Sequence, residues 1–415
     1  MYFLVKELVK KDSAAVIAAF FYLFNLYSMS QVWNRMLYSG MSAWSYLPLF
    51  IYFWIRWFQD KKIIWIIAIL LTSVIFSNTF STPAYIFTFW IPVGLFVLTN
   101  HKKRGIPHLL GILFLWIILN LWWIYPYFKV SGSAFSLISD WKANFGSLTG
   151  VSQSFPTSQI ILLRQSSLFG AGSHLYSFYS QPWIYIISLG IFLLVLVGWY
   201  KTRKEKYWLF LSILALSGWF VSKGTNFPFG YTFFKFLFSN VSFAGVLRNS
   251  YEKFGLVWVL PYSVFFALGV MRIKGVKALI ILILSCGVLT WPMWTGHVFS
   301  ESVRVKVPHY YNDANDFVMK DSRDFRVLML PITPGDGARY YWGYQGIEPS
   351  EFLFDRPSIS KILRTSYFDE KYMNLYAAFV NEKNYDSLLD EMNVKYLILH
   401  HDFDEKVTGT ISPFE

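Results

Sequence analysis

Long apolar runs recur along the first 295 residues of this chain, and they constrain its fold more than any other feature. A helix needs about 20 residues to cross a hydrocarbon layer roughly 30 Å thick. The 415 residues are 55% hydrophobic and only 15% charged, which is far more apolar than a soluble protein of this length. We therefore expect a multi-pass α-helical membrane protein with about nine spans, at residues 13–29, 38–58, 63–79, 82–99, 106–125, 182–200, 207–222, 253–271 and 277–294.

The basic residues predict the orientation of these spans. Lys6, Lys10 and Lys11 precede the first span, and "QDKK", "HKKRG", "KTRKEK" and "RIKGVK" occupy every second connection after it. Connections rich in Lys and Arg stay on the cytoplasmic side. Residues 1–12 lead into a full-length apolar segment without a small-residue cleavage site, so we expect the first span to be retained. This pattern predicts a multi-pass protein of the cell membrane with a cytoplasmic N-terminus, and residues after Gly296 outside the cell.

Two of the predicted outer connections are long, at residues 126–181 and 222–252. The first contains a short apolar piece, Ile160 to Leu163, which is long enough for a helix in the membrane interface and too short to span. The second is rich in Phe and Tyr, which favour the headgroup level. Long loops on a rigid scaffold often carry binding or catalytic residues, so we expect both to cover a site at the outer surface.

Beyond the spans the composition changes, and residues 296–415 predict a small extracytoplasmic domain. The runs "FRVLML" and "VKYLIL" are typical of strands. Between them "YDSLLDEMN" has apolar residues at helical spacing. We therefore expect a transmembrane domain at residues 1–295 followed by a mixed α/β domain at 296–415.

Several classes of function are disfavoured. The formal charge of +12 lies in short clusters between apolar segments, which indicates membrane lipids rather than nucleic acid as partners. Cys286 is the single cysteine, which excludes a disulfide framework. Neither a His and carboxylate pattern with metal-ligand spacing nor a nucleotide-binding glycine motif occurs in the sequence, and no cofactor is evident. Ionisable residues are almost absent from the spans, which disfavours ion-coupled transport.

The segment "FAGVLRNSYEKFG", Phe243 to Gly255, combines charges with the start of a span. Arg248 lies just before a predicted helix N-terminus, where free amide groups and the helix dipole favour an anion. A guanidinium group there suits phosphate, because its planar fork makes two parallel hydrogen bonds. The alternative is a cation that extends to lipid headgroups. Glu252, three residues after Asn249, is a candidate for lining a substrate cleft, and its structural alternative is a capping box.

Other outer residues compete for roles in a site. Lys253 and Lys223 are further candidates for binding a phosphate, and Arg35 and Arg164 for lining a substrate cleft; each has headgroup anchoring as its alternative. Asp140 and His174 are the plausible proton-transfer groups of the first long loop, with a solvated loop position as their alternative. The loop Gly335–Gly346, "GDGARYYWGYQG", has aromatic faces that suit sugar rings but also suit packing.

The segments "SKGTNFPFGYTFFKFLF" and "FAGVLRNSYEKFG" together resemble membrane glycosyltransferases of the GT-C class. The group with the greatest similarity is the N-terminal region of mycobacterial-type arabinofuranosyltransferases and their uncharacterised relatives. "FRVLMLP", "YYWGYQG" and "MNVKYLILHHDF" are similar to the extracytoplasmic domain of that group, and "SAAVIAAFFYLFNLYSM" is similar to one of its middle spans.

This resemblance implies transfer of a sugar from a polyprenyl-phosphate donor to an extracytoplasmic glycan or protein acceptor, with Arg248 holding the lipid phosphate. The class carries an acidic residue in its first outer loop as base or metal ligand. Here that loop, "SMSQVWNRMLYSG", contains no Asp or Glu, so we expect the chain to lack the N-terminal catalytic segment, and catalytic residues and a divalent metal stay unassigned. The alternatives are a non-catalytic protein of the same fold that binds lipid-linked sugar or assists polysaccharide assembly, and a lipid or polysaccharide transporter.

Overall fold

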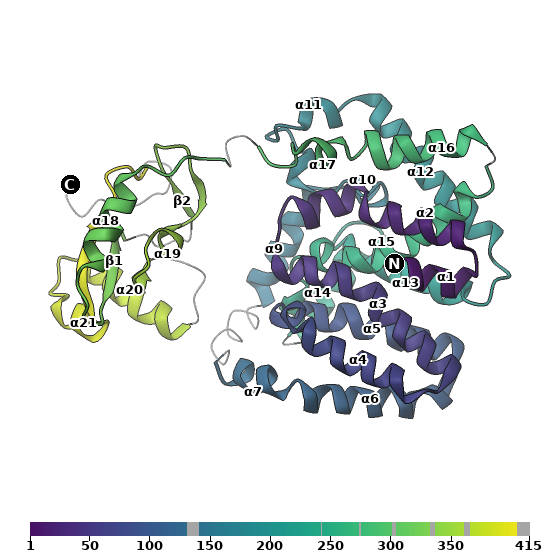
Figure 1. Ribbon diagram of the computed structural model, residues 1–415, viewed down its shortest axis with the longest axis horizontal. Coiled ribbons are helices and arrows are strands. Elements are labelled where there is room, and N and C mark those ends of the chain that lie inside the picture. Colours follow the sequence, from purple (N-terminus) through teal and green to yellow (C-terminus); the bar gives the residue numbers. More distant parts are fainter. Residues whose placement is uncertain are drawn as a thin grey trace. The chain divides into compact units, whose positions relative to one another are not determined.

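The computed structural model divides the chain into two compact units (Figure 1). It describes residues 1–130, 141–241, 243–273, 275–300, 304–332, 337–360 and 366–404. The helical unit comprises residues 1–129 and the described residues from 141 to 298. The sheet unit comprises the described residues from 299 onwards.

The first part of the helical unit contains helices at every apolar run. Its elements are α1 Tyr2–Val9, α2 Asp12–Leu23, the π-helix η1 Ser28–Trp33, α3 Tyr38–Asp60, α4 Ile63–Ile75, η2 Ser77–Ser81, α5 Ala84–Asn100, η3 Lys102–Gly105, α6 Ile106–Leu119 and α7 Leu121–Val130.

The second part of the helical unit alternates short connecting helices with apolar ones. Its elements are α9 Trp141–Gln153, α10 Thr157–Ile161, η4 Ser167–Phe169, α11 Tyr176–Tyr179, α12 Pro182–Lys201, α13 Trp208–Ser222, α14 Gly230–Asn240, η5 Ala244–Leu247, α15 Ser250–Val270, α16 Val276–Leu282, the π-helix η6 Ile283–Val288 and α17 Trp291–Thr295.

Helix α15 forms the centre of the helical unit. It packs against α13, α12, α2 and α5, and 89% of its most apolar 18-residue window is buried. A helix that is apolar all round belongs in such a position. The N-terminus of α15 is therefore held in place by several other helices.

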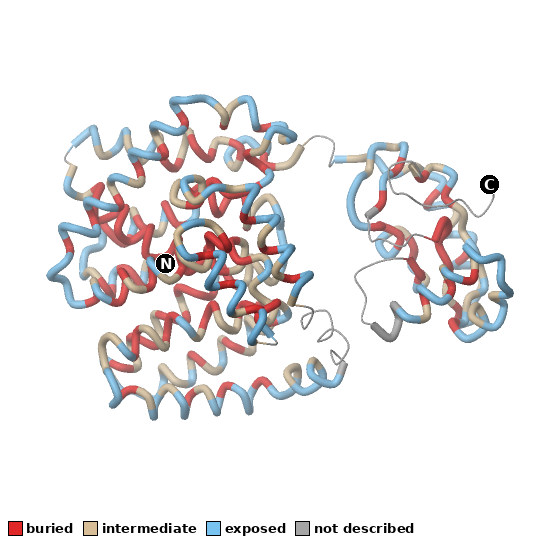
Figure 2. The backbone as a smooth tube through the Cα atoms, turned by 180° about the vertical axis from the view of Figure 1, so that it is seen from behind, coloured by how far each residue is buried: buried red, intermediate tan, exposed pale blue. Residues whose placement is uncertain are grey.

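The peripheral helices of this unit carry many apolar side chains that are exposed. Exposed side chains on α4, α6 and α12 include Ile67, Leu71, Phe114, Ile186 and Leu193, and Figure 2 shows the buried and exposed positions along each helix. Exposed apolar surface of this extent indicates contact with lipid. The fold is therefore that of a membrane protein.

The lengths of the apolar helices do not match the nine predicted spans one for one. Among the described residues, α12 and α15 are long and apolar enough to cross a membrane. A third span results if the segment Lys102–Leu119 and the segment Leu121–Lys129, bent by 71° against each other, count as one. Five further apolar helices are shorter than 18 residues. The number of spans and their orientation stay predictions.

Polar side chains explain two of the breaks. The predicted span 13–29 ends as an α-helix at Leu23, because the Asn25 side chain donates to the carbonyls of Phe21 and Tyr22, and Ser28 donates to Leu23. The predicted span 106–125 bends at Asn120, whose side chain donates to Trp116 and to Ser73. The predicted interfacial helix at Ile160–Leu163 is displaced: α10 ends at Ile161, and the longer helix of that connection is α9.

The sheet unit contains a three-stranded parallel sheet and a small hairpin. Strand β1, Arg326–Leu330, lies between β4, Ser358–Ile359, and β5, Val394–Leu399. In the register, Leu328 pairs with Ile359 and with Leu397. Strands β2, Gly337–Arg339, and β3, Gln345–Ile347, form the antiparallel hairpin. The helices are α18 Tyr310–Met319, α19 Ser350–Leu353, α20 Ser366–Val380 and α21 Asp386–Glu391.

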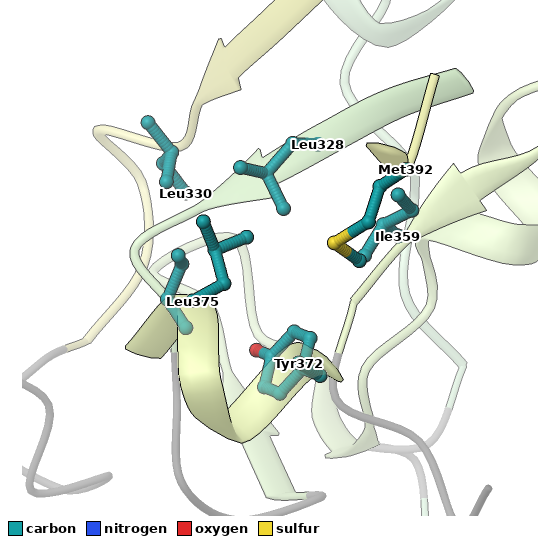
Figure 3. Packing of buried hydrophobic residues seen from close by; sticks show 7 residues of the cluster. Leu328, Leu330, Ile359, Tyr372, Leu375 and Met392 are labelled. Carbon is teal, nitrogen blue, oxygen red and sulfur yellow. The ribbon is translucent and has the colours of Figure 1, made fainter. Parts of the chain in front are cut away.

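The sheet unit has a hydrophobic core of its own. Figure 3 shows Leu328 and Leu330 of β1 with Ile359 of β4, facing Tyr372 and Leu375 of α20, with Met392 beside them. The runs predicted as strands, "FRVLML" and "VKYLIL", are β1 and β5. Their adjacency requires a crossover, which α20 and α21 supply within the described residues.

Candidate functional site

A polar cavity of about 400 Å³ lies in the helical unit beside the N-terminus of α15, within the range of about 300 to 1,000 Å³ that is usual for ligand sites. Its lining comes from three parts of the chain: η1 and the residues after it, the connection from α9 to η4, and the first turn of α15. The lining residues are Ser30, Gln31, Asn34, Arg35, Val151, Phe155, Gln165, Ser166, Ser167, Asn249, Tyr251 and Glu252.

The π-helix η1 and the residues after it line one side of the cavity. Because α2 ends at Leu23 and the chain restarts as η1, Gln31 and Asn34 turn toward other segments. Gln31 donates to the carbonyl of Gln165 at 3.2 Å, and Asn34 donates to the carbonyl of Val298 at 2.9 Å. Single π-helical turns occur often at functional sites.

Tyr27 fixes η1 against α15. Its hydroxyl donates to the main-chain carbonyl of Glu252 at 2.7 Å. Its ring lies so close to Gly255 that a Cβ atom at that position would come within 2.2 Å of it. Glycine at 255 therefore allows the first turn of α15 to approach Tyr27 and the start of η1.

An ion pair crosses the cavity. Arg35 Nη1 lies 2.8 Å from Glu252 Oε2, and the Glu252 side chain is 13% exposed while that of Arg35 is 41% exposed. The predicted capping box at this position is wrong. Asn249 is the N-cap residue of α15, but no side-chain capping hydrogen bond forms, and the Glu252 carboxylate binds Arg35 instead. The N-terminal end of the α15 dipole is thus left without a side-chain cap.

Two further cations belong to the same short segment as Glu252. Lys253 is within electrostatic reach of Glu252, Arg248 and Arg35. Arg248 is exposed, and its Nη1 donates to Asn144 Oδ1 on α9 at 3.3 Å. Three cations and one carboxylate at an uncapped helix N-terminus leave an excess of positive charge, which is an arrangement suited to an anionic group.

Other predicted residues lie away from this cavity. Lys223 is buried, and its ammonium group donates to the carbonyls of Asn226 and Pro228 in its own loop. Burial lowers the pKa of Lys223 to about 8. These two hydrogen bonds from the Lys223 ammonium group thus stabilise the connection between α13 and α14.

Arg164 and His174 also stabilise the connection between α9 and α12. Arg164 is 2% exposed; it donates to Gln159 and to the carbonyl of Tyr179, and its guanidinium group lies over the Tyr185 ring. Burial lowers the pKa of Arg164. His174 Nε2 lies 2.9 Å from the carbonyl of His297. Asp140 lies outside the described residues.

The structure thus brings Arg35, Glu252, Arg248 and Lys253 together, and adds Gln31, Asn34 and Gln165, which sequence reasoning missed. The signal for two of them was present in "QVWNR", where polar residues follow the apolar run at its outer end. Within the described residues, no group of three His, Cys, Asp or Glu side chains is placed to hold a metal ion.

Comparisons with known proteins agree on one family. The sequence model of the family described as "Alpha-(1->3)-arabinofuranosyltransferase, N-terminal GT-C domain" matches residues 171–414. No curated protein matches the chain. The structure of arabinofuranosyltransferase AftD from mycobacteria aligns with a TM-score of 0.56 at 16% identity, covering 96% of this chain and 27% of that one. A mutant form of the same protein aligns with a TM-score of 0.54 at 15% identity, covering 99% and 30%. The chain therefore spans under a third of the length of these solved relatives and shares their fold.

Proposed function

The chain belongs to the family of the N-terminal GT-C domain of alpha-(1->3)-arabinofuranosyltransferases, and from this membership we propose that it transfers a sugar from a polyprenyl-phosphate donor to a glycan acceptor. GT-C glycosyltransferases in general use a lipid-linked sugar and a glycan, and the proposal adds the chemistry of the donor. The donor sugar that we propose is arabinofuranose, after the name of the family.

One observation supports the cavity beside α15 as the place of this reaction. A space of about 400 Å³ lined by Arg35 lies at the N-terminus of a buried helix. Arg248 precedes that N-terminus and Lys253 lies in the first turn of the helix, a setting suited to a phosphate. The phosphate would bind the guanidinium group of Arg248 with the α15 dipole behind it, and the sugar would lie against the hydroxyl and amide groups of the lining. Lys223 takes no part in this proposal because its donors are used within its own loop.

The predicted alternative, a non-catalytic protein that binds lipid-linked sugar, draws support from one observation. The first outer connection, Ser28–Gly40, contains no Asp or Glu. Turnover separates the two candidates, since only the enzyme releases free polyprenyl phosphate as the acceptor is extended.

Substitution of Arg248 tests the phosphate site. Charge-assisted hydrogen bonds to a partly buried anion contribute about 1.5 to 3 kcal/mol, so Arg248→Ala in the full chain is expected to weaken binding of a synthetic polyprenyl-phosphate arabinofuranose about tenfold to a hundredfold. Arg248→Lys is expected to recover part of the loss, because a point charge keeps the attraction and loses the two-pronged geometry. The measurement is the donor Kd in lipid nanodiscs.

Lys235 provides the matched control. It is exposed on α14 in the same predicted outer connection and does not line the cavity, so Lys235→Ala removes one positive charge that lies outside the cavity lining. Its effect on donor Kd is expected to be less than about threefold, as for a screened surface charge. Equal and small effects at Arg248 and Lys235 would mean that Arg248 only anchors headgroups.

A further inference from the structure

We propose that Glu252 is the general base that removes the proton from the acceptor hydroxyl during sugar transfer. This inference rests on the proposed function and assigns the catalytic group that the first outer connection lacks. It follows from the composition of the cavity lining, the geometry of one ion pair and one unsatisfied amide oxygen.

Glu252 is the one carboxylic acid among the described residues that line the cavity. None of the other described lining residues is His, Cys or Lys. The remaining polar groups are hydroxyls, amides and the Arg35 guanidinium, which do not accept a proton at neutral pH. Among the described lining residues, the candidate base for the acceptor hydroxyl is therefore Glu252.

The ion pair leaves the carboxylate able to act. Arg35 binds Oε2 of Glu252 at 2.8 Å, and within the described part of the chain Oε1 makes no hydrogen bond. The other charged or titratable groups near Glu252 are Lys253, Tyr27 and Tyr85. Arg35 thus orients one oxygen and leaves the other for the acceptor.

Gln165 marks the cavity as a site for a hydroxylated ligand. Gln165 is 4% exposed and lines the cavity, yet its Oε1 has no hydrogen-bond partner among the residues that the structure describes. Its main-chain carbonyl accepts from Gln31 at 3.2 Å, which fixes the residue. A buried amide oxygen without a partner costs free energy unless a ligand supplies the donor. A sugar hydroxyl in the cavity would supply it once the Gln165 side chain turns toward the ligand, because Oε1 itself is buried.

The step balances in atoms and charge. The acceptor O–H gives its proton to Glu252 Oε1, and the oxygen lone pair forms the bond to C1 of the donor sugar. The bond from C1 to the phosphate oxygen breaks, and its electron pair leaves with the polyprenyl phosphate. Arg248 and Lys253, which flank the start of α15, would stabilise the charge that develops on that phosphate.

This arrangement explains how the predicted first outer connection, which contains no Asp or Glu, can still contribute to the proposed catalytic site. The residues Ser28–Gly40 supply no carboxylate of their own, but Arg35 in that connection binds a carboxylate from α15. The base and the phosphate-binding cations then come from one short segment, Arg248–Lys253.

The experiment compares Glu252→Gln with the wild-type full chain in nanodiscs. The assay measures transfer of radiolabelled arabinofuranose from a synthetic polyprenyl phosphate to a synthetic arabinofuranoside, alongside donor Kd and thermal unfolding. Loss of a general base lowers kcat about 10²- to 10⁴-fold, while donor Kd is expected to change less than about threefold. Glu252→Asp keeps a carboxylate and is expected to keep part of the activity.

Two variants separate catalysis from folding. Arg35→Gln breaks the same ion pair but leaves the carboxylate, so its loss of kcat is expected to be smaller than that of Glu252→Gln. Glu205→Gln removes a carboxylate in "KTRKEK", away from the cavity, and is expected to behave as wild type.

Each outcome decides between the claims. Absence of transfer by the wild-type chain overturns the proposed function and this inference with it. Wild-type transfer with undiminished transfer by Glu252→Gln overturns the base and leaves the function intact. A loss of donor binding in Glu252→Gln equal to its loss of transfer makes Glu252 a binding group and overturns its role as base.

Discussion

At the residue scale, Lys223 is a cation whose surroundings favour its neutral form. It is 1% exposed, and burial lowers its pKa to about 8, whereas the unfolded chain keeps a lysine pKa near 10.4. Between these values the unfolded chain binds a proton that the folded chain has released, so the free energy of unfolding rises with pH from about 8 to about 10.4. We therefore expect the difference in thermal unfolding temperature, wild type minus Lys223→Met, to increase as the pH rises across this interval.

The comparison needs a lysine that titrates normally when folded. Lys235→Met removes an exposed amine and is expected to keep the wild-type rise in unfolding temperature. An identical pH dependence in Lys223→Met and the wild type would show that Lys223 is solvated.

Single residues of the site could be predicted in part. The positions of Arg248 before α15 and Glu252 in its first turn follow from local sequence. The partner of Glu252 does not, because Arg35 lies far away in the chain and local rules favour a capping box. Gln165 gave no signal at all, since its place in the cavity depends on the path of the whole outer connection.

At the element scale, close contact between α12 and α15 holds the central helix. A Cβ atom at Gly198 of α12 would lie 1.9 Å from the carbonyl oxygen of Phe265 in α15. Small residues allow such approach between membrane helices. We expect Gly198→Ala to lower the free energy of unfolding by about 1 to 3 kcal/mol, as overpacking does elsewhere.

Gly190 in the same helix is the control. A Cβ atom there meets no atom within 4 Å. Gly190→Ala is expected to leave stability unchanged or raise it by up to about 1 kcal/mol, because alanine favours the helix. If denaturant titration gave both variants the same stability, α12 would not pack on α15 as described.

The presence of helices could be predicted better than their ends. Apolar runs of spanning length predicted where helices occur, and the structure has a helix within each of these runs. The breaks depend on side-chain bonds to the backbone, at Asn25 after α2 and at Asn120 between α6 and α7. The helix α9 was missed because its sequence, "WKANFGSLTGVSQ", contains two glycines and few apolar residues, and its stability comes from packing against α14.

At the scale of the whole molecule, the family could be recognised from short motifs spread along the chain. The resemblance to GT-C arabinofuranosyltransferases is confirmed by the match over residues 171–414. The number of spans and the side on which the sheet unit lies stay predictions, because hydropathy and charge do not determine how short and bent helices insert. The cavity adds what motifs do not contain, namely which distant residues meet at the start of α15.

Photo-crosslinking tests the proposed site most directly. A polyprenyl phosphate bearing a diazirine next to the phosphate is bound to the full chain in nanodiscs, irradiated, and the labelled peptides are mapped by mass spectrometry. We expect labels within residues 248–253 and 31–35, which excess unlabelled polyprenyl phosphate removes and which Arg248→Ala reduces. Labels spread over the bare apolar faces of α4, α6 and α12, unchanged by competitor or by Arg248→Ala, would contradict a phosphate-lipid site at the N-terminus of α15.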